Sequence, residues 1–210
     1  MSGRGADLAA GAIAYGIGSV PTGVIVSRLS RGIDVRDYGS GGMGTTNVLR
    51  TVGPLAAGSV FALDVAKGAA AVLVARGLGA TNAGQAGAGL AAVVGHSWPL
   101  WARFHGGKSV ATGFGAVLVL SPEGALAAVI GGLTALAATR VVSVGSLAAA
   151  ASATAGAGAA MLHGSRRGPW PFAYAAAATA VIAARHSDNL RRLAHGAEPR
   201  ISIASLKPGR

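Results

Sequence analysis

The chain has 210 residues, of which 51% are hydrophobic and only 12% are charged, and its mean hydropathy is +0.52. Soluble domains carry about a quarter charged residues, so this composition excludes an ordinary soluble domain and is typical of a multi-pass membrane protein. A net charge of +11 would suggest nucleic acid as the partner of a soluble protein. Here the basic residues lie in short loops between apolar segments, so we expect them to contact the lipid bilayer and expect no nucleic-acid binding.

Seven apolar segments follow one another along the chain, and none shows the two-residue alternation of a barrel strand. They cover residues 8–26, 52–75, 83–101, 110–120, 124–138, 142–162 and 170–184. This pattern predicts an all-α integral membrane protein, a bundle of about seven transmembrane helices that forms one domain over residues 1–210. The fourth and fifth segments are shorter than the roughly 20 residues of a perpendicular span. A tight re-entrant pair at this point, and a total of six spans, are therefore alternatives.

The basic residues are distributed unevenly between the two sides of this predicted bundle. Thirteen Lys and Arg residues fall on the side of the C-terminus, four fall on the side of the N-terminus, and Lys67 lies within a span. Because Lys and Arg favour the cytoplasmic side, the count predicts an external N-terminus and a cytoplasmic C-terminus. Three polar clusters then lie on the cytoplasmic side, where they are predicted to build one active site.

The first polar cluster is the glycine-rich stretch 39–50, with the sequence GSGGMGTTNVLR. Such a loop exposes backbone N–H groups, which can surround a phosphate together with nearby hydroxyl groups, while an arginine supplies the countercharge. The candidate substrate-binding residues are Ser40, Gly41, Thr45, Thr46, Asn47 and Arg50. The alternative is a flexible turn, which is the usual role of glycine.

A G-x-G-x-x-G pattern in this cluster, followed by Asp64, has the spacing of a dinucleotide-binding fingerprint. We reject that interpretation because an arginine-rich loop precedes the glycines and a membrane span follows them, where the fingerprint requires a strand and a βαβ unit. Asp64 is better explained by Lys67, which lies three residues later on the same helix face. The two side chains are predicted to neutralise each other within the span.

The second cluster comprises His96 and residues 104–108, and it follows the third apolar segment. Gly106 and Gly107 form a turn that allows close approach and presents the Lys108 ammonium to an anion, although a lysine here also fits a topology or headgroup role. His96 ends an apolar run, where an ionisable side chain is either functional or a hydrogen-bonding tie between helices. A loose Walker A match over residues 102–109 is discounted, because a membrane helix precedes it.

The third cluster follows the last apolar segment and contains His186 and Asn189. These two residues are three positions apart, so they share a helical face and point toward the same surface. Ser143 is a weaker candidate because a serine at a helix start usually caps the helix. Five histidines at irregular spacing and no cysteine do not indicate a zinc site, and we expect neither a metal nor a cofactor.

Together these residues resemble the bacterial integral-membrane acyl-phosphate:glycerol-3-phosphate acyltransferases. Three motifs match in order: GSVPTG at 18–23 through Arg50, Gly95-His96 through Thr112, and ARH at 184–186 through Glu198. The resemblance implies a seven-span enzyme of the bacterial cytoplasmic membrane with a site facing the cytoplasm. Its substrates would be acyl-phosphate and glycerol 3-phosphate, and its products lysophosphatidic acid and phosphate, in the first step of phospholipid synthesis.

The resemblance also implies roles for individual residues. Ser40, Arg50, Lys108 and Asn189 would bind phosphate groups, while His96 and His186 would organise the site or assist proton transfer. The predicted catalytic set is Ser40, His96, Lys108 and His186. The predicted substrate-binding set is Gly41, Thr45, Thr46, Asn47, Arg50, Gly106, Gly107, Ser143 and Asn189.

Three positions depart from the family pattern, which has Asn at Gly42, Ala at Thr45 and Gly at Ser109. A divergent paralogue is therefore one alternative function. A membrane transporter of a phosphorylated metabolite is another, because transporters also place basic groups and broken helices at membrane depth. The sequence does not indicate an oligomeric state.

Overall fold

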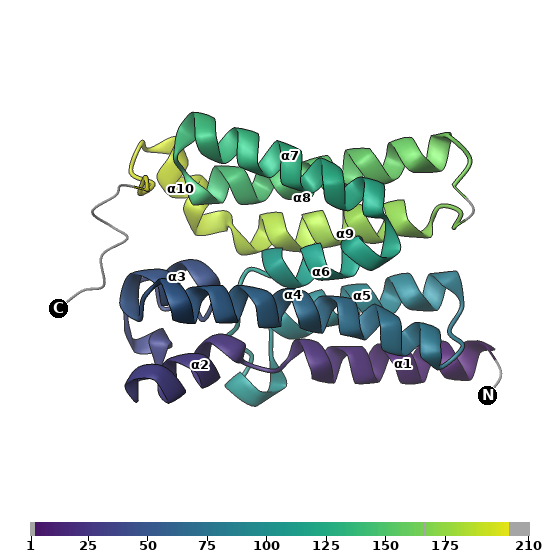
Figure 1. Ribbon diagram of the computed structural model, residues 1–210, viewed down its shortest axis with the longest axis horizontal. Helices are drawn as coiled ribbons and strands as arrows, with labels where there is room; N and C mark the ends of the chain where they lie inside the picture. Colours follow the sequence, from purple (N-terminus) through teal and green to yellow (C-terminus); the bar gives the residue numbers. More distant parts are fainter. Residues whose placement is uncertain (1–2, 166, 202–210) are drawn as a thin grey trace.

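The computed structural model describes residues 3–165 and 167–201, which form a bundle of α-helices joined by short loops (Figure 1). The α-helices are α1 (Gly3–Gly18), α2 (Thr22–Arg31), α3 (Thr45–Thr51), α4 (Pro54–Gly77), α5 (Asn82–Ser97), α6 (Val110–Leu120), α7 (Pro122–Thr139), α8 (Val142–Leu162), α9 (Trp170–Arg185) and α10 (Ser187–Ala194). Two short 3-10 helices are η1 (Val35–Asp37) and η2 (Leu100–Ala102). Arg166, Lys207 and Arg210, which entered the charge count, lie outside the described residues.

Each of the seven apolar segments contains a helix, which confirms the all-α prediction for the described part of the chain. Four helical segments are long and apolar enough to cross a membrane: Gly3–Arg31, Pro54–Gly77, Pro122–Thr139 and Val142–Leu162. The helices α5 and α9 have 16 residues each and α6 has 11. At 1.5 Å per residue, α6 rises only about 16 Å, well short of the roughly 30 Å hydrocarbon core. The chain is thus a multi-pass membrane protein whose shorter helices lie within the bundle.

The first apolar segment is not one continuous helix, as the sequence predicted, but two helices separated by residues 19–21. Pro21 precedes α2 and lacks a backbone N–H, and it also disfavours helical backbone at Val20. Proline acts similarly at the end of α5, which stops at Ser97 because Pro99 follows Trp98. Prolines therefore free backbone groups at the end of the bundle that carries the polar clusters.

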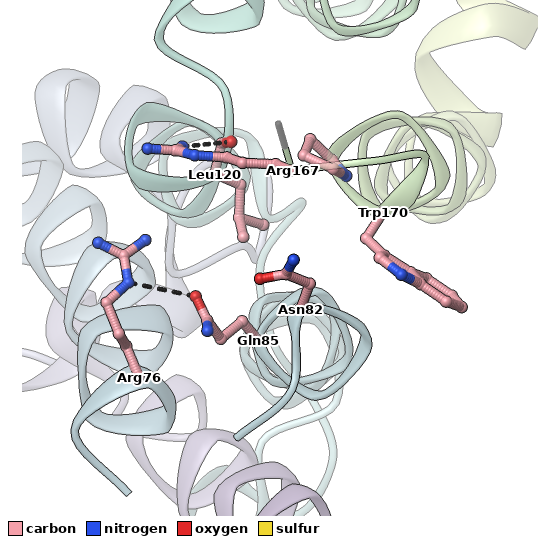
Figure 2. Close-up of a pocket in the computed structure, with 7 residues that line it drawn as sticks. Arg76, Asn82, Gln85, Leu120, Arg167 and Trp170 are labelled. Carbon is pink, nitrogen blue, oxygen red and sulfur yellow. Dashed lines mark hydrogen bonds between the residues drawn. The ribbon is translucent and has the colours of Figure 1, made fainter. Parts of the chain in front are cut away.

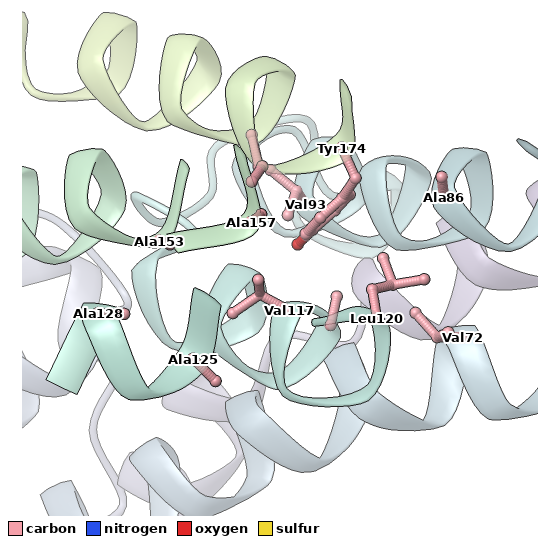
Figure 3. Close-up of a cluster of buried hydrophobic side chains, with 13 residues drawn as sticks. Val72, Ala86, Val93, Val117, Leu120, Ala125, Ala128, Ala153, Ala157 and Tyr174 are labelled. Carbon is pink, nitrogen blue, oxygen red and sulfur yellow. The ribbon is translucent and has the colours of Figure 1, made fainter. Parts of the chain in front are cut away.

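Small residues allow neighbouring helices to approach closely. A Cβ atom added to Gly115 of α6 would lie 1.9 Å from the carbonyl oxygen of Val65 in α4, and one added to Gly68 would lie 2.0 Å from that of Thr112. The largest core cluster lies between α4, α5, α6, α7, α8 and α9 and contains Tyr174, whose hydroxyl donates to the Gly113 carbonyl at 3.0 Å (Figure 3). Close packing of this kind replaces the hydrophobic drive that lipid cannot supply.

The helices α2, α3 and α10 gather at one end of the bundle, and the N-terminus lies at the other (Figure 1). The two ends therefore differ in architecture. One end carries short helices and long polar loops, and the other carries tight connections between the longer helices.

Gly115→Ala tests the α4–α6 contact. The added methyl group would meet Val65 backbone atoms, so we expect a loss of about 1–3 kcal/mol in stability, measured as a lower Tm in detergent. Gly58→Ala is the matched control, because no heavy atom lies within 4 Å of its added Cβ and alanine favours helix. Equal Tm values for the two variants would contradict the contact.

Candidate active site

Asn47 organises the glycine-rich loop. Its Nδ2 group donates to the carbonyl oxygens of Val35 at 3.0 Å, Tyr38 at 3.0 Å and Gly42 at 2.7 Å, and its Oδ1 accepts from the Ser40 backbone N–H at 3.0 Å. The residue is 3% exposed. The side-chain amide thus makes all these hydrogen bonds to the backbone of the loop. Asn47 therefore fixes the shape of the loop and does not present its amide to a ligand.

The other candidates of the first cluster lie on the outer side of this loop. Ser40 and Arg50 are exposed, and Gly41 has a φ of +69° that suits glycine. Thr45 and Thr46 begin α3 after Gly44, which offers no side chain as a cap. Their backbone N–H groups belong to the first turn, where helical N–H groups lack intrahelical partners.

His96 lies beneath the turn that carries Lys108. Its backbone carbonyl accepts from the Gly107 N–H at 3.0 Å, and a Cβ atom at Gly107 would lie 2.2 Å from its Nε2 atom. The ring is 3% exposed, and its Nδ1 atom is 3.5 Å from the Asp64 carboxylate. His96 therefore supports the turn and contacts a buried acid, and only the turn separates it from the surface above.

A buried polar network surrounds Asp64. One carboxylate oxygen, Oδ1, lies 2.8 Å from the Lys67 ammonium and accepts from the Thr22 hydroxyl at 2.6 Å. Lys67 also donates to the Val20 carbonyl at 3.0 Å, at the break between α1 and α2. The predicted Asp64–Lys67 pair is confirmed, and the structure adds that it fastens this break to α4.

Lys108 and Asn189 meet in a network that joins the second and third clusters. The Lys108 ammonium donates to Asn189 Oδ1, and Asn189 Nδ2 donates to Glu198 Oε1 at 2.5 Å. Glu198 also accepts from the Ser143 hydroxyl at 2.9 Å and from Arg192 Nε at 2.7 Å. The amide of Asn189 is thereby oriented with its oxygen toward the lysine.

The charges of this network are tuned by burial and by hydrogen bonding. Lys108 is exposed as a whole residue, but its ammonium contacts the buried Asn189, and partial burial lowers the pKa of Lys108. Burial would raise the pKa of Glu198, but hydrogen bonds from Asn189, Arg192 and Ser143 outweigh it and hold this pKa below its usual value. The carboxylate is therefore ionised at neutral pH and fixes its three donors.

His186 is held in one tautomer next to this network. Its Nδ1 atom lies 2.8 Å from the Ile182 carbonyl, which only accepts, so Nδ1 carries the proton and Nε2 keeps a lone pair. Burial lowers the pKa of His186, and the positive charge of Lys108 lowers it further. The ring is therefore neutral at pH 7 and fit to accept a proton.

Arg185 holds the glycine turn and was not among the predicted site residues. Its Nε group donates to the Gly107 carbonyl at 3.1 Å and its Nη2 group to the Gly106 carbonyl at 3.2 Å. The guanidinium also lies 5.4 Å from the centre of the Trp98 ring, in a cation–π contact. Arginine at the end of a membrane helix is typical of an anchor, so its sequence position gave no signal of this role.

The structure thus joins the second and third clusters directly, through Lys108, Asn189, Ser143 and the turn tied to Arg185. The first cluster lies at the same end of the bundle (Figure 1). No hydrogen bond or ion pair between residues that the structure describes connects it to the other two. Glu198 was also absent from the predicted site residues, although it ends the third matching motif and is an isolated acid in a basic C-terminal stretch.

The departures from the family pattern are accommodated locally. A Cβ atom at Gly42 would lie 3.7 Å from Ser40 Oγ, so a side chain fits there. Ser109 has a left-handed φ of +60°, and its hydroxyl donates to the Val93 carbonyl at 2.7 Å and lies 2.6 Å from the Ser97 hydroxyl. Its side chain is buried against α5 and leaves the outer side of the glycine turn clear.

Glu198→Gln tests the network by its pH dependence. Because the folded-state pKa lies below the ordinary value of 4.5, the carboxylate stabilises the fold above that pH and loses this effect as pH falls through the folded pKa. We expect a Tm lower by about 2–4 °C at neutral pH, equivalent to about 1 kcal/mol. The difference from the unmodified protein should shrink below pH 4.5. A difference that does not change with pH would contradict an ionised Glu198.

Comparison with known proteins identifies the family. Residues 8–196 match the family described as glycerol-3-phosphate acyltransferase. The chain is 43% identical over 191 residues to a glycerol-3-phosphate acyltransferase of Prochlorococcus marinus (strain MIT 9313), over 91% of this chain and 93% of the relative. A relative of the same name from Bacillus velezensis (strain DSM 23117 / BGSC 10A6 / LMG 26770 / FZB42) is 52% identical over 56 residues, which is 27% of this chain and 29% of the relative.

The fold is similar to two crystal structures of PlsY (YgiH), an integral membrane glycerol 3-phosphate acyltransferase. The glycerol 3-phosphate form is 34% identical with a TM-score of 0.86, over 95% of this chain and 98% of that one. The lysophosphatidic acid form is 33% identical with a TM-score of 0.84, over 95% and 97%. The chain therefore belongs to the glycerol-3-phosphate acyltransferase family that its motifs predicted, and its enzymatic class is acyl transfer to glycerol 3-phosphate.

Proposed function

We propose that this protein transfers a fatty acyl group from acyl-phosphate to the sn-1 hydroxyl of glycerol 3-phosphate, releasing lysophosphatidic acid and phosphate. The observation that carries the proposal is the fixed Lys108–Asn189–Glu198 network beside the neutral His186. Glycerol 3-phosphate and lysophosphatidic acid are named in the two similar crystal structures and correspond to the acceptor and the product.

Acyl-phosphate is an activated mixed anhydride, so the reaction requires no covalent intermediate on the enzyme. The glycerol hydroxyl oxygen attacks the acyl carbonyl carbon, and the bond between that carbon and the phosphate oxygen breaks. Lys108 stabilises the negative charge on the departing phosphate. Such stabilisation by a preorganised group is usually the largest single contribution to catalysis. The hydroxyl proton passes to His186 Nε2 or to a substrate phosphate.

The first cluster supplies the remaining phosphate contacts in this proposal. Ser40, Arg50 and the backbone of Thr45 and Thr46 line the outer side of a loop that Asn47 holds in shape. Two anionic substrates are then positioned by two basic loops, which supplies the orientation that a bimolecular transfer requires. His96 acts beneath the glycine turn as a positioning residue.

An apolar cleft accounts for the acyl chain. It lies between α6, α7, α8 and α9, and its lining includes Val110, Val117, Ala149, Ala178 and Ile182. Val110 follows Lys108 by two residues, and the Ile182 carbonyl holds His186, so one end of the cleft adjoins the polar network. A fatty chain in this cleft would place its carbonyl group next to the catalytic side chains.

The proposed setting is the bacterial cytoplasmic membrane, with the chain forming one seven-span domain over residues 1–210. The Lys and Arg bias supports an external N-terminus and a cytoplasmic C-terminus. Glycerol 3-phosphate would then enter from the cytoplasm, and the acyl donor from the bilayer.

Reporter fusions test this orientation. A reporter after Arg210 should read cytoplasmic, and one inserted near Gly168, in the loop between α8 and α9, should read external. The measurement is paired activity of alkaline phosphatase and green fluorescent protein fusions. An external C-terminus would exclude a cytoplasmic active site.

Lys108→Ala tests the chemistry. We expect turnover to fall on the order of a hundredfold, because one preorganised cation is lost, while the Tm stays near that of the unmodified protein. The assay follows lysophosphatidic acid formed by purified protein in detergent from acyl-phosphate and glycerol 3-phosphate. Arg103→Ala is the matched control, since it removes an exposed basic side chain from the same loop.

Unchanged turnover in a folded Lys108→Ala protein would mean that the lysine only helps to set the membrane topology and takes no part in the reaction. A protein that moves substrate across sealed vesicles without converting it would instead be a transporter.

A further inference from the structure

A second polar cavity lies at the end of the bundle opposite α10, where α4 and α6 end and α5 and α9 begin (Figures 1 and 2). Its volume is about 190 Å³. Four polar side chains line it, Arg76, Asn82, Gln85 and Arg167, together with Leu120 and Trp170. None of them belongs to the proposed active site.

Two arginines give this cavity a positive charge. Among residues 3–165 and 167–201, no carboxylate lies within 4.0 Å of the Arg76 or Arg167 guanidinium. Arg76 Nε donates to Gln85 Oε1 at 3.2 Å, and its terminal amino groups make no hydrogen bond within the described part of the chain. Both arginines line the cavity and are exposed, so their remaining donors are accessible to a ligand.

Each arginine also has a simpler role. Arg167 Nη1 donates to the carbonyls of Val119 at 2.7 Å and Leu120 at 2.6 Å, and so caps the end of α6. Arg76 lies in the last turn of α4, where a positive charge complements the helix dipole. These roles explain one donor group of Arg167 and the position of Arg76. They do not explain why both guanidinium groups and two amide side chains line one cavity.

The lining also has an apolar part, which an amphiphilic ligand could contact. Leu120 is 4% exposed and belongs to the largest core cluster, whereas Trp170 is 43% exposed at the start of α9. Tryptophan at a helix end is typical of the membrane interface, where headgroups lie. The cavity is thus lined both by guanidinium groups and by an apolar indole ring.

We propose that this cavity binds a phosphate group, with Arg76 and Arg167 as its cationic ligands and the Asn82 and Gln85 amides completing the shell. A guanidinium presents paired donors that match phosphate oxygens. The phosphate belongs either to a phospholipid headgroup of the adjoining leaflet or to a free anion. The site is separate from the acyl-transfer centre and does not depend on the proposed reaction.

The test measures binding to full-length protein in a non-ionic detergent by isothermal titration and thermal shift. The probes are short-chain phosphatidylglycerol, diacylglycerol with the same chains, and inorganic phosphate. The background is Lys108→Ala, which weakens phosphate binding at the other end. Arg76→Gln is compared with Arg4→Gln, which removes one exposed charge from the same end of the bundle without changing the cavity.

We expect Arg76→Gln to weaken phosphatidylglycerol binding about tenfold, as the loss of a hydrogen bond to a charged group does. Arg4→Gln should bind as the Lys108→Ala background does. Arg76→Lys keeps the positive charge but loses the paired guanidinium donors, so its affinity should lie between those of the Arg76→Gln and Arg4→Gln variants. This variant also provides the test if Arg76→Gln misfolds. Tighter binding of phosphatidylglycerol than of inorganic phosphate assigns the site to a headgroup, and equal affinities assign it to a free anion.

Two outcomes would overturn the proposal. Equal binding by the Arg76→Gln and Arg4→Gln variants would mean that only the overall charge of this end matters. Equal binding of diacylglycerol and phosphatidylglycerol would mean that the phosphate is not recognised.

Discussion

One buried carboxylate oxygen, Oδ1 of Asp64, determines how the polar end of the bundle is assembled. An ionised acid within an apolar span is costly unless it is paired and hydrogen-bonded, and here the partners come from three helices. Thr22 belongs to α2, Lys67 to α4 and His96 to α5, at 2.6, 2.8 and 3.5 Å. Lys67 pairs with Asp64 within α4 itself, so displacing α2 or α5 would leave the ion pair in place but remove one of its additional polar partners.

Two polar loops, the glycine-rich loop and the turn that carries Lys108, pack against that arrangement. The helix α2 packs against the glycine-rich loop, because Gly23 lies so close to the Met43 carbonyl that an added Cβ would be 1.8 Å from it. His96 supports the other loop at Gly107. The polar loops are then completed by side chains that bind backbone, namely Asn47 in the first and Arg185 in the second. Both loops are thus held by hydrogen bonds within the protein, and such preorganisation is what the proposed electrostatic catalysis requires.

The helices were predictable from sequence because each follows from a local signal. The bounds of α6 and α8 agree with the prediction, since polar and left-handed residues flank their apolar runs, and the Asp64–Lys67 pair follows from helical spacing. The break between α1 and α2 also had a signal, namely Pro21, but the prediction of the first span rested on hydropathy alone. The roles of Asn47, Arg185 and Glu198 could not be predicted in this way. The partners of Asn47 are backbone groups of an irregular loop, which no periodic pattern describes, and the tertiary fold brings Gly107 to Arg185 and Ser143 to Glu198.

The hydrogen bond between Lys108 and Asn189 has a consequence for the timing of the reaction cycle. The ammonium already has an acceptor within the protein, and Glu198 accepts a hydrogen bond from the other end of the same amide. A phosphate bound at Lys108 would therefore replace a neutral amide acceptor with an anionic one, and the gain in affinity would be the difference between these two partners of the ammonium. In the proposed reaction, the same exchange in reverse would return the lysine to its amide partner as phosphate departs, so a contact of this kind would limit product inhibition.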